Sequence, residues 1–406
     1  MRVAFTLIGG SGWTGGRNYL RNLLASLARL GAPRIEPLLF AGTDVDPAEM
    51  EELTSDLAAP PRLHPLWNRG RAGASRLARA VFLQRDHAAE TAFRAEGVDL
   101  VFQHSAWLGV RFGLPTLAWI ADFQHRRLPG MFSPGNWLRR EVGYGGLSVS
   151  ATTILLSSED ARASCERYYP LSRGKTAVLP FAVAPPPGSW EGDVRGCLAR
   201  YRLPERYVFL PNQLWKHKNH AAAVEALRIV ASRCPDLVLV LSGAALDSRH
   251  PAHPRRVLDS IERQGLGGRA RVLGMIPYED VLTLARGAVA VLNPSLSEGW
   301  STTVEEAKTF GTPLCLSDLP VHREQAPRGT LFFDPRSPSD LADALAGAWA
   351  APSRPRPPLE RVRHAARERQ ERFAEGFDAI ARETIARFRE GSKRTVGVPA
   401  KEVGGG

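Results

Sequence analysis

The sequence predicts an α/β protein made of two doubly wound, Rossmann-like domains that face each other across a cleft. Its 406 residues exceed the usual size of one hydrophobic core, so the length favours two domains. Strand-like apolar runs alternate with helix-length segments along most of the chain, which is typical of parallel sheets covered by helices on both faces. Consecutive prolines within 182–188 interrupt this rhythm, because they exclude helix and donate no hydrogen bonds to a sheet. We therefore expect domains at 1–182 and 189–352.

Both predicted domains repeat the same alternation. In the first, an apolar strand over 3–8 leads through a glycine loop over 9–16 into a helix. The other strands expected in this domain are Glu36–Phe40, Val98–Phe102, Thr116–Ile120, Thr153–Leu156 and Thr176–Leu179. In the second domain the expected strands are Tyr207–Leu210, Leu237–Leu241, Ala270–Leu273, Ala288–Leu292 and Leu314–Leu316. Ligands of such sheets collect beyond the carboxyl ends of the strands, so both domains should contribute to one cleft.

The C-terminal segment predicts one more helix. After a proline-rich stretch over 351–358, an Arg/Glu-rich pattern predicts a helix over 359–390 that crosses back to pack on the N-terminal domain. The polar, glycine-ended tail over 391–406 is expected to be disordered.

Cysteine usage and hydropathy favour a cytoplasmic protein. The four cysteines lack C-x-x-C spacing, which argues against a zinc site or a disulfide framework. The apolar run at the N-terminus breaks into glycines too early for a signal peptide, and nowhere do eighteen apolar residues follow one another. We expect a chain that does not span a membrane.

The net charge of +11 is concentrated in part of the chain. The segment 62–94 has seven arginines but only Asp86 and Glu90 as acids, and it offers an apolar helix face, formed by Leu77, Val81, Phe82, Ala89 and Phe93. Such a face could rest on an anionic membrane at the inner side of the cell, or guide a lipid-linked acceptor. An ordinary solvated surface is the alternative. Aromatic residues suited to stacking bases are not interleaved here, so we expect no nucleic-acid partner.

The segment Asn293–Pro313 predicts an anion-binding helix start. Ser301 and Thr302 are good N-cap residues, and the free amides over 301–303 with the positive end of the helix dipole would suit a diphosphate. Gly299 would let the backbone come close to a ligand. Glu298 follows the strand and Glu306 lies about one turn inside the helix, so both carboxylates could face one pocket.

A second polar loop, Pro211–His220, follows the strand predicted at Tyr207–Leu210. It places Asn212, Gln213 and Lys218 near the same cleft. Taken alone, Lys218 would be an ordinary solvated lysine at a helix start.

Together these segments resemble the retaining glycosyltransferases of family 4, within the glycosyl transferases group 1, which have the GT-B fold. Glu298, seven intervening residues and Glu306 are similar to the family's E-x7-E motif, followed by Gly311-Thr-Pro313. The resemblance implies that Glu306 binds the ribose hydroxyls and that Glu298 contacts the donor sugar. It also implies that the N-terminal domain takes the acceptor and the C-terminal domain holds the donor.

The 211–220 loop resembles the family loop in which an Arg and, five positions later, a Lys hold the diphosphate. Lys218 matches the Lys, but Gln213 stands at the position of the Arg and cannot neutralise a phosphate. Lys216, His217 or the helix dipole would then have to compensate.

The acceptor side resembles the family less closely. The family segment often reads His-Asp after the strand; here Ala121 stands in place of the His, Asp122 is aligned, and His125 is the nearest imidazole. Asp122 and His125 are candidates for contacts with sugar hydroxyls, with a purely structural His125 as the alternative. Gly15 and Gly16 would permit close approach of the backbone to the donor phosphates or the acceptor, unless they only form a tight turn.

These resemblances imply transfer of a hexosyl unit, from GDP-mannose or a UDP-hexose, to a saccharide or lipid-linked acceptor, with retention of anomeric configuration. Polysaccharide biosynthesis is the expected context. No metal ligands and no cofactor are expected, since the nucleotide sugar is a co-substrate and no Asp-x-Asp motif stands out. A nucleotide-sugar epimerase of the same fold and a lapsed nucleotide-sugar-binding protein are the alternatives.

Overall fold

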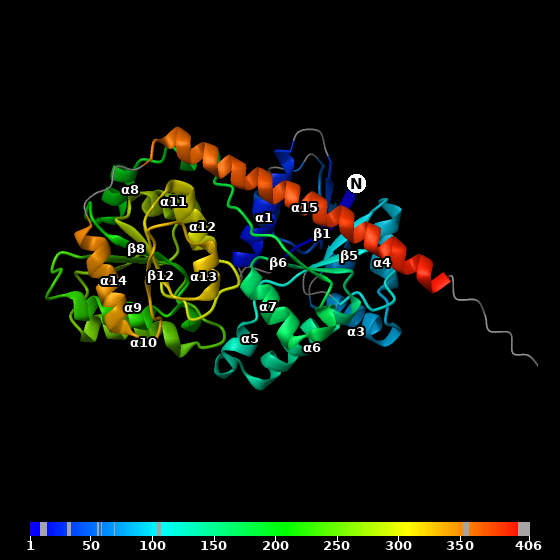
Figure 1. The fold of residues 1–406 in the computed structure, drawn as a ribbon, viewed down its shortest axis with the longest axis horizontal. Helices are drawn as coiled ribbons and strands as arrows, with labels where there is room; N and C mark the ends of the chain where they lie inside the picture. The colour runs from blue at the N-terminus through cyan, green and yellow to red at the C-terminus, as the bar shows by residue number, and fades with distance from the viewer. Residues whose placement is uncertain are drawn as a thin grey trace, which may run out of the picture.

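The computed structural model describes residues 1–8, 14–30, 34–54, 57, 59–68, 70–103, 107–351 and 357–396. Two α/β domains lie side by side, with the C-terminal domain on the left and the N-terminal domain on the right of Figure 1. The N-terminal sheet has seven strands in the order β3-β2-β1-β4-β5-β6-β7, and the C-terminal sheet has six in the order β10-β9-β8-β11-β12-β13. The prediction of two parallel-sheet α/β domains is confirmed.

The N-terminal domain wraps helices around a fully parallel sheet. Its strands are β1 (Arg2–Thr6), β2 (Glu36–Ala41), β3 (Arg62–Leu63), β4 (Leu100–Gln103), β5 (Thr116–Trp119), β6 (Thr153–Leu156) and β7 (Thr176–Val178). Its α-helices are α1 (Thr14–Ala28), α2 (Pro47–Thr54), α3 (Arg71–Leu83), α4 (His87–Ala95), α5 (Gln124–Arg127), α6 (Pro134–Ser150) and α7 (Glu159–Tyr168). The two-residue strand β3 was not predicted, because so short a segment has no alternation to reveal it.

The C-terminal domain repeats this architecture. Its strands are β8 (Val208–Pro211), β9 (Leu239–Ser242), β10 (Ala270–Val272), β11 (Ala290–Asn293), β12 (Leu314–Ser317) and β13 (Leu331–Phe333). Its α-helices are α8 (Val194–Tyr201), α9 (His220–Val230), α10 (Ala252–Arg263), α11 (Tyr278–Gly287), α12 (Thr302–Phe310), α13 (Pro320–Gln325) and α14 (Pro338–Ala350). Strands β8, β9, β11 and β12 are buried apart from Pro211, as expected for a parallel sheet covered on both faces.

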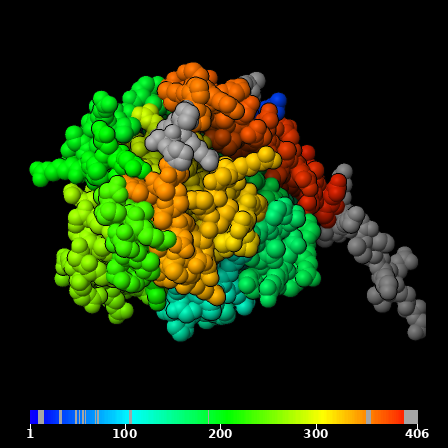
Figure 2. Space-filling model, turned by 60° about the vertical axis from the view of Figure 1, so that its left-hand side comes forward, coloured from blue at the N-terminus to red at the C-terminus, as the bar shows by residue number. Residues whose placement is uncertain are grey.

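A long helix, α15 (Leu359–Val396), joins the two domains over one face of the molecule (Figures 1 and 2). It contacts α12 in the C-terminal domain and α1 and β5 in the N-terminal domain. The helix continues to Val396, so the predicted end at 390 is too early. Gly391 does not end it, because a glycine inside a helix costs only about 1 kcal/mol relative to alanine. The rest of the predicted disordered tail, 397–406, lies outside the described residues.

The basic segment 62–94 does not form one amphipathic helix face. Gln84, in the left-handed conformation with φ of 55°, ends α3, and Asp86 starts α4 by accepting a hydrogen bond from the Ala89 amide at 3.1 Å. Ala89 and Phe93 are fully buried in the domain core, whereas the apolar residues of α3 point outward. The predicted face is therefore divided between two helices. Within the described part of the chain, no helix combines the length and apolarity needed to cross a bilayer.

Substitution of Phe377 in α15 tests how much this helix contributes to the stability of the N-terminal core. Its ring is 0% exposed and lies 5.9 Å from the ring of Phe5 and 5.7 Å from that of Phe102. We expect Phe377→Ala to lower the free energy of unfolding by about 3–5 kcal/mol, through lost burial and a cavity. Urea unfolding followed by circular dichroism measures this. Phe82→Ala is the matched control, because that ring is 87% exposed; equal losses in both variants would contradict a core role for α15.

Candidate functional site

A cavity of about 530 Å³ lies in the cleft, and both domains line it. The predicted site residues that line it are Gly15, Asp122, Asn212, Gln213, Lys218, Glu298, Gly299, Thr302, Thr303 and Glu306. Strands β8 and β11 are neighbours in the sheet, so the loops that follow them meet at one edge. The structure thus brings together the two motifs of the C-terminal domain, 80 residues apart in sequence.

Lys218 and Glu298 form an ion pair at the centre of this cavity. The Lys218 ammonium donates to Glu298 Oε1 at 2.6 Å, and the two side chains are only 16% and 7% exposed. Lys218 ends a 3₁₀ turn, Lys216–Lys218, and Asn219 then reverses the chain into α9 with φ of 60°. The Ser295 hydroxyl also lies 2.6 Å from Glu298 Oε1 and donates to it. Both charges are therefore held in place by neighbouring elements, and an anion in the cavity would compete with Glu298 for Lys218.

The start of α12 borders the same cavity. Ser301 is the N-cap, as predicted: its hydroxyl accepts from the Val304 amide at 3.4 Å. The Ser301 amide itself donates to Gln325 Oε1 at 3.1 Å, and Ser301 is not among the lining residues. Thr302 and Thr303, at the positive end of the helix dipole, do line the cavity. Residues 302–303 therefore border the cavity, and Ser301 caps the helix that carries them.

The amide of Asn212 connects the two motifs. Its Nδ2 donates to Thr303 Oγ1 at 2.8 Å, which joins the loop after β8 to the first turn of α12. Gly243, with φ of 133°, lies so close that a Cβ there would be 2.5 Å from the Asn212 carbonyl oxygen. Backbone packing thus fixes the position of Asn212, and of the neighbouring Gln213.

Glu306 lies deeper, one turn inside α12, and is 5% exposed. Burial raises the pKa of its carboxyl to about 7, and Tyr278, Arg21 and Lys218 offset part of this effect. Arg21 belongs to α1, and its guanidinium carbon lies 4.6 Å from the centre of the Tyr278 ring on α11. In its ionised form this carboxylate can accept hydrogen bonds from a pair of ligand hydroxyls.

Gly299 brings the donor-side loop against the N-terminal domain. A Cβ at Gly299 would lie 1.8 Å from the carbonyl oxygen of Ala121, so no other residue fits. The Ser158 hydroxyl donates to the Gly299 carbonyl oxygen at 2.9 Å. The close approach that Gly299 permits is thus to the backbone of the other domain, and Asp122 and Glu298 line the same cavity.

Asp122 is held by its own domain and faces the cavity. Its Oδ1 accepts from the Gln124 amide at 3.0 Å and from Arg140 of α6 at 3.1 Å. Its side chain is 17% exposed. It therefore keeps a fixed carboxylate on the N-terminal side of the cleft.

The structure does not bring His125 to the cavity. The side chain is 0% exposed, and its Nε2 lies 2.8 Å from Glu141 Oε1 and 2.9 Å from the Tyr169 hydroxyl. Burial lowers the pKa of the imidazole below its ordinary value. The predicted contact of His125 with a sugar hydroxyl is at odds with this burial, because α5 turns the ring into the domain; the alternative of a structural histidine fits.

The cations that face Lys218 from the other domain were not predicted. Arg17 and Arg21 lie four residues apart on α1, so they share the helix face that lines the cavity. Gly15 also lines the cavity, whereas Gly16 is buried in α1 and does not line it. Residues 9–13 of the glycine loop lie outside the described residues. The sequence feature that could have indicated these two arginines is their four-residue spacing directly after the glycine loop.

Two of the residues expected to compensate for Gln213 bring no positive charge to the cavity lining. His217 is 2% exposed, and burial, with Lys218 and Arg249 nearby, lowers its pKa well below the ordinary value, so it is neutral at pH 7. Lys216 is exposed and lies outside the cavity lining. Arg17 and Arg21 are the cationic side chains that accompany Lys218 in the lining.

Residues 201–369 match the model of the family described as glycosyl transferases group 1. The whole fold is similar to that of Anabaena Alr3699/HepE solved with UDP and glucose, with 15% identity, a TM-score of 0.63, and coverage of 98% of this chain and 100% of that one. It is also similar to sucrose-phosphate synthase from Thermosynechococcus elongatus, with 19% identity, a TM-score of 0.64, and coverage of 97% and 99%.

WaaG, a glycosyltransferase involved in lipopolysaccharide biosynthesis, matches with 15% identity, a TM-score of 0.59, and coverage of 98% of this chain and 100% of that one. At these identities the structural likeness shows the fold alone. The chain therefore has the GT-B fold, and its C-terminal domain is similar to the group 1 glycosyl transferases.

Proposed function

We propose that this protein is a glycosyltransferase that moves a hexosyl unit from a nucleotide sugar, such as GDP-mannose or a UDP-hexose, to a saccharide or lipid-linked saccharide acceptor. The observation that carries the proposal is the buried Lys218–Glu298 pair, 2.6 Å apart, beside the start of α12 in a cavity that both domains line. The match of residues 201–369 to the group 1 glycosyl transferases supports it.

The cavity has a place for each part of the donor. Glu306, buried beneath the α12 start, would accept hydrogen bonds from the two ribose hydroxyls. Lys218 and the amides at Thr302 and Thr303 would hold the diphosphate, with Arg17 adding positive charge from the other domain. The donor sugar would then lie between Glu298 and Asp122.

Departure of the nucleoside diphosphate is the demanding step. The bond from the anomeric carbon to the phosphate oxygen breaks, and negative charge develops on that oxygen while the sugar becomes oxocarbenium-like. Lys218 and the α12 dipole would stabilise this charge without a metal ion. For retention, the acceptor hydroxyl would attack on the face that the diphosphate leaves, and its proton would pass to the departing phosphate oxygen. Glu298 would orient the sugar hydroxyls and stabilise the developing positive charge.

Donor binding tests the phosphate role of Lys218. We expect one of the UDP, GDP, ADP or TDP sugars to raise the thermal midpoint of the wild type, with and without magnesium. Lys218→Ala should weaken that binding by about 10- to 100-fold, since a hydrogen bond to a charged group contributes about 1.5–3 kcal/mol. Lys216→Ala is the matched control, because this exposed lysine of the same turn lies outside the cavity. No stabilisation by any nucleotide sugar would count against the donor site.

Glu298→Gln separates binding from turnover. The substitution removes the carboxylate that pairs with Lys218, so a nucleoside diphosphate should bind as tightly as in the wild type or more tightly. Turnover should fall by about 100-fold or more, because stabilisation of the transition state is lost. Transfer is measured with the donor found by thermal shift, and nucleotide binding by calorimetry. Normal turnover in Glu298→Gln would remove Glu298 from the chemistry.

The raised pKa of Glu306 predicts a pH dependence of donor binding. The ionised carboxylate accepts from both ribose hydroxyls, so affinity should be constant above about pH 8 and weaken about tenfold between pH 8 and pH 6 for a pKa of about 7. A nucleotide sugar is the appropriate ligand, because its diphosphate diester does not titrate in this range. Glu306→Gln should bind more weakly and show a flat profile. A flat profile in the wild type would contradict the assignment.

A further inference from the structure

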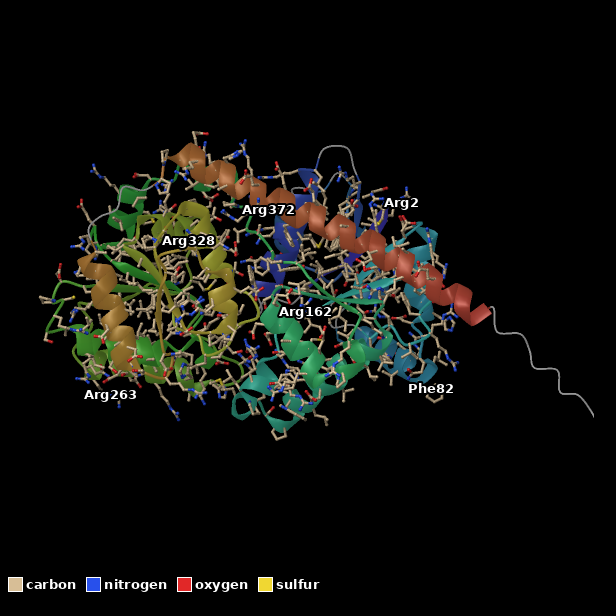
Figure 3. All side chains as sticks on the ribbon, viewed as in Figure 1. Arg2, Phe82, Arg162, Arg263, Arg328 and Arg372 are labelled. Carbon is tan, nitrogen blue, oxygen red and sulfur yellow. The ribbon has the colours of Figure 1, made fainter. Side chains whose placement is uncertain are left out.

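Helix α3 turns its apolar residues away from the protein. Of its described side chains only Ala80 is buried, whereas Leu77, Val81, Phe82 and Leu83 are 48%, 50%, 87% and 49% exposed. Figure 3 shows Phe82 at the outer edge of the N-terminal domain, away from the other domain. A surface helix ordinarily packs its apolar stripe on the core, so this arrangement is reversed.

Helix α6 carries a second exposed apolar stripe. Leu138, Val142 and Val149 are 57%, 67% and 48% exposed, and their spacing of four and seven residues places them on one side of the helix. An apolar stripe with this spacing normally packs against the core, but here it faces solvent. The stripe is therefore unpartnered along most of α6.

The loop over 107–113 connects the two helices into one surface. The Arg111 amide donates to the carbonyl oxygen of Gln84, the residue after α3, at 2.9 Å. At the other end, the Trp107 ring packs on α6, where a Cβ at Gly146 would lie 2.4 Å from it. Val110 of this loop is 45% exposed. We call this surface the α3–α6 face; it consists of Leu77, Val81, Phe82, Leu83, Val110, Leu138, Val142 and Val149.

The charges around the α3–α6 face have one sign. Helix α3 and the 107–113 loop contain no acidic residue, and Glu141 of α6 turns inward to His125. The nearby acids Asp86 and Glu90 are each 4% exposed. Both are neutralised by ion pairs with arginines of the same region, Arg76, Arg85 and Arg94. The exposed charges of the face are thus positive.

Three arginines provide that positive charge: Arg79, Arg111 and Arg139. All three side chains are exposed, and none has an ion-pair partner within the described ranges. An apolar surface bordered by these cations, with no exposed carboxylate among the described residues of α3, the 107–113 loop and α6, complements a layer of apolar chains beneath anionic headgroups.

We propose that the α3–α6 face docks the protein on an anionic lipid bilayer, with Phe82 and the neighbouring aliphatic side chains inserted below the headgroups. A second copy of the chain is a poorer partner, because a two-fold contact would bring the same arginines against one another. Docking does not depend on the proposed transferase function.

The position of the face matters for the acceptor. Arg140 of α6 donates to Asp122 in the cavity at 3.1 Å, so the docking surface and the acceptor side of the cleft are on opposite sides of one helix. A lipid-linked saccharide would therefore start about one helix diameter, ~10 Å, from the cleft when the face rests on its bilayer; this step rests on the proposed function.

Vesicle flotation of the full chain tests docking. Vesicles of phosphatidylcholine with phosphatidylglycerol should bind the wild type, and pure phosphatidylcholine should bind it much less. Each arginine near an anionic surface raises the membrane partition coefficient by about fivefold. The double variant Arg79→Glu with Arg139→Glu should therefore lower binding by about 25-fold or more. Val81→Ser with Phe82→Ser should lower it by about tenfold or more.

Leu246→Ser with Arg328→Glu is the matched control, since both residues are exposed on the C-terminal domain and Leu246 is 67% exposed. It should bind as the wild type does. The proposal is overturned if the wild type does not bind anionic vesicles, or if the α3–α6 variants bind normally. It is also overturned if sedimentation shows a wild-type dimer that Val81→Ser with Phe82→Ser converts to a monomer. No nucleotide enters this assay, and donor-induced thermal shifts of the same variants report separately on the donor site.

Discussion

The two domains meet in a close backbone contact beside the cleft. At Gly299 the loop after β11 touches the end of β5 so closely that any side chain would strike the Ala121 carbonyl oxygen. Hydrogen bonds from Ser158 to the Gly299 carbonyl oxygen, and from the Trp300 indole to the Phe181 carbonyl oxygen at 3.2 Å, fix the two backbones on either side of this contact. Asp122 and Glu298 consequently line one cavity although they come from different domains.

The same cleft balances positive and negative charge. Lys218 is neutralised by Glu298, and Asp122 by Arg140, while burial favours the protonated form of Glu306. Removing these groups from water would be costly if they were unpaired, so each carboxylate has a cation or a proton to compensate it. An anionic ligand that replaces Glu298 as the partner of Lys218 would leave the Glu298 carboxylate to accept hydrogen bonds from the Ser295 hydroxyl and from hydroxyls of the ligand.

Sequence reasoning recovered the features that local patterns encode. Strand alternation predicts the two parallel sheets. The polar residues that follow each strand predict the N-cap at Ser301 and the convergence of Lys218, Glu298 and Glu306 on one cavity. Sequence reasoning failed where tertiary packing decides which way a side chain points. The four-residue helix α5 has no periodicity to show that His125 turns inward, and the break at Gln84, which reverses the faces of α3 and α4, carries no glycine or proline. Arg17 and Arg21 line the cavity because tertiary packing brings α1 to the cleft, and their spacing alone does not specify that packing.

Helix α15 makes the N-terminal domain discontinuous along the chain. Phe373, Ala374, Phe377 and Ala381 belong to the same buried cluster as Phe5 and Phe102, and Gln370 donates to the Val183 carbonyl oxygen of the linker at 3.1 Å. During synthesis, residues 1–182 must therefore wait for nearly the whole remaining chain to leave the ribosome before their core is complete. The C-terminal domain, whose buried clusters lie within residues 197–349, can close first. The half of the protein that is made first is thus finished last, and an interrupted chain would expose the apolar surface that α15 covers.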